Sequence, residues 1–235
     1  MSRTPDWQHN VVEYEKQTVN NPNPFARFAH RRRLKIALQR VLELPEGSLV
    51  VDYGCGQGRF LSDIDKTSPS KFMLMGWDPI QSQLFDGYAI VDDLAKIAPN
   101  SVDMIVCLEV CEHLNEDETE TFLAFAKSRL KPDGRLLVTV PVMIGPALIL
   151  KELNRMILFR RRPEHAWIEL LKASFLNQVP ERAMNIDTSH KGYDFRETMR
   201  ALSRNFDPTR VTYSPLPLKT WWGNSQAVFE CRQSR

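Results

Sequence analysis

The chain has 235 residues, of which 43% are hydrophobic and 26% charged, so its composition is that of a soluble globular protein and excludes wholesale disorder. This length favours one α/β domain over residues 1–235 rather than two complete small domains. The net charge of +2 gives the molecule no overall field that would indicate nucleic acid or a membrane as its partner.

The cysteines and the first residues indicate the cellular setting. Cys55, Cys107, Cys111 and Cys231 lack the paired spacing of a metal site, and three of them lie in or beside apolar runs, where a free cysteine packs as a small hydrophobe. The first residues are polar, and no apolar run is long enough to span a bilayer. We therefore expect a reducing compartment and a cytoplasmic protein.

An N-terminal segment, residues 1–47, is expected to lead into the fold as a helix. Apolar side chains recur at roughly helical spacing from Pro24 to Leu44, and Pro45-Glu46-Gly47 ends the pattern. The triplet Arg31-Arg32-Arg33 lies inside this pattern, and a second triplet follows at 160–162. We interpret both triplets as solvated helix ends.

Short apolar runs then alternate with helical patterns. Residues 48–52 and 71–78 are strand-like, and residues 59–66 between them have helical spacing. This alternation predicts a Rossmann-like, doubly wound α/β fold, with a mostly parallel sheet of seven strands, an antiparallel last strand, and a ligand beyond the carboxyl ends of the strands. The other expected elements are strands over 88–91, 102–108, 135–140, 211–214 and 227–231, helices over 116–130 and 192–206, and a turn over 131–134.

A helical insertion, residues 142–190, follows the fifth strand of this core. Its apolar residues fall on one helical face, while Lys151, Arg155 and residues 160–162 add positive charge. The insertion is either a lid over the active site or, through residues 147–162, a peripheral contact with an anionic membrane. The face consists of Ile149, Leu150, Leu153, Met156 and Ile157.

Gly54, Gly56 and Gly58 form a G-x-G-x-G loop directly after the first strand. Residues without side chains let the backbone approach a ligand, and the helix that follows can favour a carboxylate at its N-terminus. A dinucleotide-binding loop has its third glycine at a different spacing, and a phosphate-binding P-loop needs Gly-Lys-Ser/Thr, which is absent. The loop alone therefore suggests a nucleotide-like ligand without identifying it.

Residues 48–141 resemble the class I S-adenosylmethionine-dependent methyltransferases, in the broad group that contains the ubiquinone-biosynthesis O-methyltransferases. Five motifs occur in the order that this family has them, which is far more specific than one glycine loop. The resemblance implies S-adenosyl-L-methionine as the cofactor. The motifs are Val50–Gly58, Gly76-Trp77-Asp78, Val91-Asp92-Asp93-Leu94, Leu108–Leu114, and Lys131–Arg135 leading to Val140-Pro141.

Three acids carry most of the cofactor recognition that this resemblance implies. Asp78 is placed to accept from both ribose hydroxyls, with a strand-end turn as its other interpretation. Asp52 is placed to accept from the amino group, or else caps a helix. Asp93 is placed to accept from the adenine amino group or else belongs to a turn, and its neighbour Asp92 is the other candidate for the adenine contact. The full expected cofactor set is Asp52, Gly54, Cys55, Gly56, Gly58, Asp78, Asp93, Leu94 and Glu109.

His113 is the candidate catalytic base, because an imidazole has an unperturbed pKa near cytoplasmic pH and could take a proton from a hydroxyl or ammonium acceptor. Its other interpretation is a residue that orients the following helix. Glu109, Glu112 and His113 also reproduce an E-x-x-E-H arrangement that is associated with a divalent cation in the ubiquinone-type enzymes. Many relatives share this string with no metal implied, so we predict no metal site.

We therefore predict an enzyme that moves a methyl group to an O or N atom of a small-molecule acceptor, which could be lipid- or glycan-linked, by in-line displacement. The alternative is a noncatalytic module that binds the cofactor and docks on a membrane or protein through its basic helix. DNA is not an expected partner, because Leu108-Glu109-Val110-Cys111 replaces the Asp/Asn-Pro-Pro-aromatic tetrapeptide that favours methylation of exocyclic amines.

Overall fold

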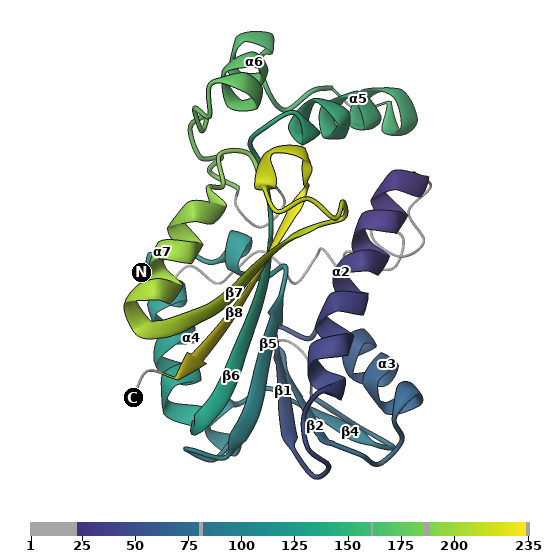
Figure 1. Ribbon diagram of the computed structural model, residues 1–235, viewed down its shortest axis with the longest axis vertical. Coiled ribbons are helices and arrows are strands. Elements are labelled where there is room, and N and C mark those ends of the chain that lie inside the picture. Colours follow the sequence, from purple (N-terminus) through teal and green to yellow (C-terminus); the bar gives the residue numbers. More distant parts are fainter. Residues whose placement is uncertain (1–22, 80–81, 161, 186–188, 234–235) are drawn as a thin grey trace.

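The structure is a computed structural model that describes residues 23–79, 82–160, 162–185 and 189–233 (Figure 1). Its centre is a sheet of eight strands in the order β3-β4-β2-β1-β5-β6-β8-β7. The pairs from β4 to β6 are parallel, and β8 runs antiparallel to both of its neighbours. The strands are β1 (Leu49–Tyr53), β2 (Met73–Trp77), β3 (Gln83–Phe85), β4 (Tyr88–Val91), β5 (Val102–Leu108), β6 (Leu130–Pro141), β7 (Phe206–Ser214) and β8 (Gln226–Gln233).

This sheet confirms the predicted Rossmann-like class, with one additional strand. β3 is a three-residue edge strand antiparallel to β4, and no periodicity could show it because it is short and mostly exposed. The expected turn over residues 131–134 lies within β6 instead. The pairing of β6 with β5 shifts register between Val102 and Met104, so these four residues form an irregularity in the ladder.

Helices cover both faces of the sheet (Figure 1). On one face α2 and α3 pack with Val50, Leu74 and Val106 into one buried cluster. On the other face α4 and α7 contribute Phe122, Phe195 and their neighbours to a larger cluster. The helices are α2 (Pro24–Leu42), α3 (Arg59–Thr67), α4 (Glu116–Arg129), α5 (Ala147–Phe159), α6 (Trp167–Phe175) and α7 (Phe195–Asn205).

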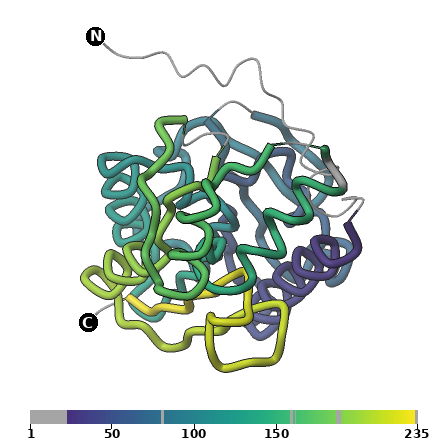
Figure 2. Tube along the Cα trace, turned by 90° about the horizontal axis from the view of Figure 1, so that it is seen from above, coloured from purple at the N-terminus to yellow at the C-terminus, as the bar shows by residue number. Residues whose placement is uncertain are grey.

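The insertion after β6 forms α5 and α6, which lie beyond the carboxyl ends of the parallel strands (Figures 1 and 2). Part of the predicted N-terminal segment, residues 1–22, lies outside the described residues, as does Arg161 of the second arginine triplet. Within the described ranges, no helix is both long enough and apolar enough to cross a membrane.

Candidate active site

The glycine loop connects β1 to α3 at the carboxyl end of the sheet. Gly54, Gly56 and Gly58 have φ angles of 74°, 52° and 71°, a conformation that L-residues with side chains seldom adopt. The amides of Gly54 and Cys55 donate to the carbonyl of Trp77 at 2.8 and 3.0 Å, which fixes the loop against the end of β2. A Cβ atom on Gly56 would have no protein atom within 4 Å, so this glycine faces open space.

Asp52 and Asp78 lie together beneath this loop, at the ends of two paired strands. Asp52 pairs in register with Gly76 in β2, and Asp78 follows the end of β2. Both carboxylates are buried, and the Gly56 amide donates to Asp78 Oδ2 at 3.1 Å. Burial, and then the nearby charge of Asp78, raise the pKa of Asp52 to about 8.

Two buried acids beside an open glycine backbone suit a ligand that presents an amino group and hydroxyl groups. The amino group would compensate Asp52, and hydroxyls would donate to Asp78. These residues therefore fit the cofactor that the sequence motifs imply.

Asp93 and Leu94 follow β4, next along the same edge of the sheet. Asp93 caps a short 3-10 helix, Leu94–Lys96, by accepting from the Ala95 amide at 2.8 Å. The structure therefore gives Asp93 the turn role that was its other interpretation, and a residue in such a turn can still contact adenine.

Cys55 lies within the glycine loop. Its side chain is half-buried, and burial raises the pKa of its thiol.

Glu109 begins the segment after β5, with φ at 58°, an uncommon backbone conformation for a glutamate. Its carboxylate forms an ion pair with Arg33 Nη1 at 2.9 Å and accepts from the Thr139 hydroxyl at 3.2 Å. Arg33 is fully buried, so the interpretation of residues 31–33 as a solvated helix end is wrong for this arginine. The exposed Arg31 and Arg32 agree with it. No sequence motif singles out Arg33, because its partner is 76 positions away.

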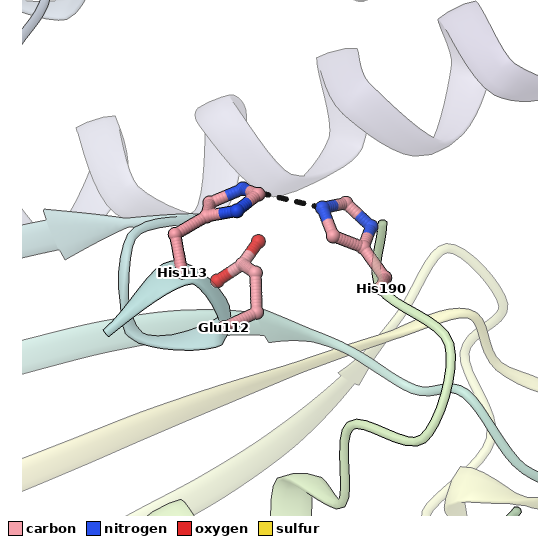
Figure 3. Close-up of side chains that lie close together, drawn as sticks. All are labelled: Glu112, His113 and His190. Carbon is pink, nitrogen blue, oxygen red and sulfur yellow. Dashed lines mark hydrogen bonds between the residues drawn. The ribbon is translucent and has the colours of Figure 1, made fainter. Parts of the chain in front are cut away.

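His113 meets His190 from the insertion, with 3.2 Å between their Nε2 atoms (Figure 3). Burial, and then the neighbouring His113, Lys151 and Arg182, lower the pKa of His190 to about 3, so this ring is neutral at physiological pH. One ring nitrogen of the pair must then donate to the other.

Glu112 points toward the same histidine pair (Figure 3). It is fully buried, and neither carboxylate oxygen has a hydrogen-bond partner among the described residues. Burial and the charge of Glu109 raise its pKa. Ligand atoms of Glu112, His113 and His190 lie within 4.8 Å of one another and could hold a metal ion. Glu109, which completes the E-x-x-E-H string in the sequence, pairs with Arg33 instead.

Two further basic side chains border this cluster, and no sequence motif predicts either of them as a site residue. Lys151 of α5 donates to the carbonyls of Val142 and Ser225 at 3.0 and 3.3 Å, which anchors the insertion to the ends of β6 and β8. Burial lowers its pKa to about 8. Burial, and then Arg33, lower the pKa of His30 to about 4. The polar cluster is therefore built by α2, the segment after β5 and the insertion together.

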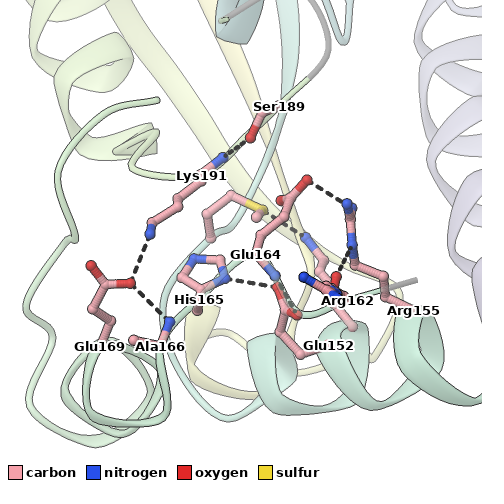
Figure 4. A network of polar contacts seen from close by, with 11 residues as sticks. Glu152, Arg155, Arg162, Glu164, His165, Ala166, Glu169, Ser189 and Lys191 are labelled. Carbon is pink, nitrogen blue, oxygen red and sulfur yellow. Dashed lines mark hydrogen bonds and ion pairs between the residues drawn. The ribbon is translucent and has the colours of Figure 1, made fainter. Parts of the chain in front are cut away.

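Polar contacts hold the two helices of the insertion to each other and to the chain beyond (Figure 4). His165 Nδ1 lies 2.7 Å from Glu152 Oε1, and both side chains are buried. Lys191, next to His190, pairs with Glu169 of α6 at 2.7 Å. The position of His190 at the site is thus tied to α6.

Comparisons with known proteins agree with this architecture. Residues 25–183 match the model of a methyltransferase domain family. A Burkholderia thailandensis 1,6-didemethyltoxoflavin-N1-methyltransferase with bound S-adenosylhomocysteine is similar in structure, with a TM-score of 0.56 at 15% identity, over 94% of this chain and 86% of that one. No curated protein matches the sequence.

Two further solved structures share the fold at low sequence identity. A geranyl diphosphate methyltransferase has a TM-score of 0.53 at 11% identity, over 87% of this chain and 79% of that one. A SAM-dependent methyltransferase from Aquifex aeolicus has a TM-score of 0.51 at 14% identity, over 86% of this chain and 97% of that one. At these identities the likeness concerns the fold.

Proposed function

This chain belongs to the methyltransferase domain family, and on that premise we propose that it moves a methyl group to an O or N atom of a small-molecule acceptor at the carboxyl ends of its strands. It is an S-adenosylmethionine-dependent methyltransferase of Rossmann-like fold. The observation that carries the proposal is the position of buried Asp52 and Asp78 directly beneath the open backbone of Gly56.

The residues of this edge have distinct roles in holding the cofactor. Asp52 accepts from its amino group and Asp78 from its ribose hydroxyls, while Asp93 and Leu94 lie farther along the edge, on the adenine side. Gly54, Cys55, Gly56 and Gly58 supply a backbone that a ligand can approach closely. Glu109 contributes to cofactor binding through the backbone turn that follows β5, because Arg33 and Thr139 already hold its carboxylate.

When bound, the cofactor supplies an electrophilic methyl group on a sulfonium. The protein holds the acceptor in line with that methyl, and positioning of this kind lowers the barrier without covalent help from the enzyme. His113 accepts the proton that a hydroxyl or protonated amine loses. His190 contacts the His113 ring at Nε2 and holds its orientation.

The acceptor is a small molecule that enters between the strand ends and the insertion. Among the structurally similar proteins, one is named a 1,6-didemethyltoxoflavin-N1-methyltransferase and another a geranyl diphosphate methyltransferase. Such different acceptors share one fold, so the acceptor of this chain must be recognised by its own α2, α5 and α6.

His113→Gln tests the base. We expect kcat to fall by about 10²-fold or more while the affinity for S-adenosylhomocysteine stays unchanged, because the imidazole acts on the acceptor and not on the cofactor. The measurements are turnover against pH on an acceptor panel and calorimetry with S-adenosylhomocysteine.

Three outcomes would contradict parts of this proposal. Full activity of His113→Gln would remove the base. Loss of turnover on treatment with EDTA, restored by a divalent cation, would reassign Glu112, His113 and His190 as metal ligands. Cofactor binding without turnover across a broad acceptor panel would favour the noncatalytic module.

A further inference from the structure

The helices α5 and α6 form one end of the molecule (Figures 1 and 2), and they carry a group of exposed apolar side chains. We call it the α5–α6 surface. Its members are large apolar side chains that are 39 to 70% exposed, although α5 and α6 also bury residues against the core. They are Leu150, Leu153, Ile157, Trp167, Ile168, Leu171, Phe175 and Leu176.

Helical spacing collects these side chains on the outer face of each helix. Leu150, Leu153 and Ile157 recur at intervals of three and four in α5, and Ile168, Leu171 and Phe175 do the same in α6. Trp167 precedes Leu171 by four residues. The opposite faces hold the buried Leu148 and Leu170. Folding therefore needs only the inner faces, and the outer apolar faces are left uncovered by the described residues and available to a partner.

The charge of the insertion indicates the chemistry of this partner. Residues 147–176 contain six basic and three acidic side chains, a local excess of +3 in a chain whose total is +2. Each acid is already engaged, Glu152 with His165, Glu164 with Arg155 and Glu169 with Lys191.

Three exposed basic side chains of the insertion have no acidic partner among the described residues. Arg160, Arg162 and Lys172 form no ion pair among the described residues. A second copy of the chain on this surface would bring the same cations against one another, which disfavours a symmetric dimer. An anionic lipid bilayer meets both requirements, because it offers acyl chains to the apolar face and phosphates to the cations.

We propose that the α5–α6 surface docks on an anionic lipid bilayer, with its apolar side chains in the headgroup–acyl boundary and Arg160, Arg162 and Lys172 at the phosphates. The consequence for catalysis rests on the proposed function. Because this surface lies at the same end as the site, a docked enzyme would receive an acceptor that is dissolved in or anchored to the bilayer.

Co-sedimentation of the full-length protein with lipid vesicles tests the docking. We expect binding to phosphatidylcholine vesicles that contain about one third phosphatidylglycerol, and a loss on the order of 100-fold in the partition coefficient for Arg160→Gln/Arg162→Gln/Lys172→Gln. Ile157→Ser/Ile168→Ser/Leu171→Ser should also lose binding, since the apolar contact is removed.

Matched variants elsewhere on the surface control for general changes in charge and hydrophobicity. Lys127→Gln/Arg200→Gln/Arg204→Gln removes three exposed cations from α4 and α7, and Met73→Ser/Leu84→Ser removes two exposed apolar side chains from β2 and β3. Both control variants should bind vesicles like the wild type.

The proposal is overturned if wild type does not sediment with anionic vesicles, or if the control variants lose as much binding as the test variants. A dimer at micromolar concentration that the triple serine variant dissociates would assign the surface to a second copy. Sedimentation is measured without cofactor, and calorimetry with S-adenosylhomocysteine is run in parallel. Failure of the docking is thereby distinguished from failure of the proposed methyl transfer.

Discussion

Ionisation of Asp52 is unfavourable in the folded protein, because the fold buries its carboxyl group beside that of Asp78. The Asp52 pKa of about 8 lies above that of an unfolded aspartate, near 3.9, so the folded state binds more protons between these two values. Folding stability therefore falls as pH rises through this window. A ligand amino group placed against Asp52 would reverse the effect, since it favours the ionised carboxylate.

Asp52→Asn should remove this pH dependence. We expect the free energy of unfolding of the wild type to fall by several kcal/mol between about pH 5 and pH 9, and that of the variant to change much less. Urea denaturation at the two pH values measures both. Asp133→Asn, on an exposed segment of β6, should follow the wild type; equal pH dependence in all three proteins would contradict the burial argument.

The raised pKa of Asp52 also predicts that a proton is released when the cofactor binds. At pH 7 Asp52 is mostly protonated in the free protein, and pairing with an ammonium would ionise it. Calorimetry with S-adenosylhomocysteine in buffers of different ionisation enthalpy should show close to one proton released per site. Binding with no proton exchange would mean that the amino group lies elsewhere.

Among the elements, α2 places Arg33 at the active site, where it pairs with Glu109. The helical pattern of this segment in the sequence does not show that role. Arg33→Met would leave the Glu109 carboxylate without its cation in a largely buried position, and we expect a loss of about 3–5 kcal/mol in unfolding free energy. Arg33→Met/Glu109→Gln should recover much of this loss. Additive losses in the double variant would show that the two side chains are not coupled.

The buried contact between Glu152 and His165 joins α5 to the segment that leads into α6. Glu152→Gln weakens the contacts with His165 and the Glu164 amide, and we expect hydrogen exchange over residues 147–176 to accelerate by about tenfold while the sheet is unaffected. Glu120→Gln, on an exposed face of α4, is the control. Acceleration spread evenly over the whole chain would instead indicate global destabilisation.

At the scale of the whole molecule, the parallel core could be predicted from the sequence because its strands are apolar runs, and glycine or an acid directly follows β1, β2, β4 and β5. β4 and β5 occur at the predicted bounds, and β1 and β2 differ from theirs by only one or two residues. β3 could not be predicted, because an exposed three-residue edge strand has no hydrophobic pattern.

One part of the candidate site could likewise be predicted from the sequence, and the other part could not. The glycine loop and Asp78 follow local motifs, so their positions on neighbouring strand ends could be predicted. Arg33 meets Glu109 across 76 positions of the sequence, His190 meets His113 across 77, and Lys151 reaches the Ser225 carbonyl across 74. No spacing rule gives such contacts. The acceptor side of the site is therefore the part that needs the three-dimensional structure.

The central claim is that the cofactor binds over Gly56, and two glycine variants test it most directly. Gly47 and Gly56 both have positive φ, 77° and 52°, and a Cβ on either meets no protein atom within 4 Å, so a leucine at each should cost a similar one or two kcal/mol of stability. Gly47 precedes β1, at the opposite end of the strand.

Calorimetry with S-adenosylhomocysteine on the wild type, Gly47→Leu and Gly56→Leu is the decisive measurement. We predict that Gly47→Leu binds like the wild type and that Gly56→Leu loses affinity by at least about 100-fold, because its side chain occupies the space of the ligand. Unchanged affinity in Gly56→Leu, or tighter binding of NAD than of S-adenosylhomocysteine by the wild type, would contradict the claim.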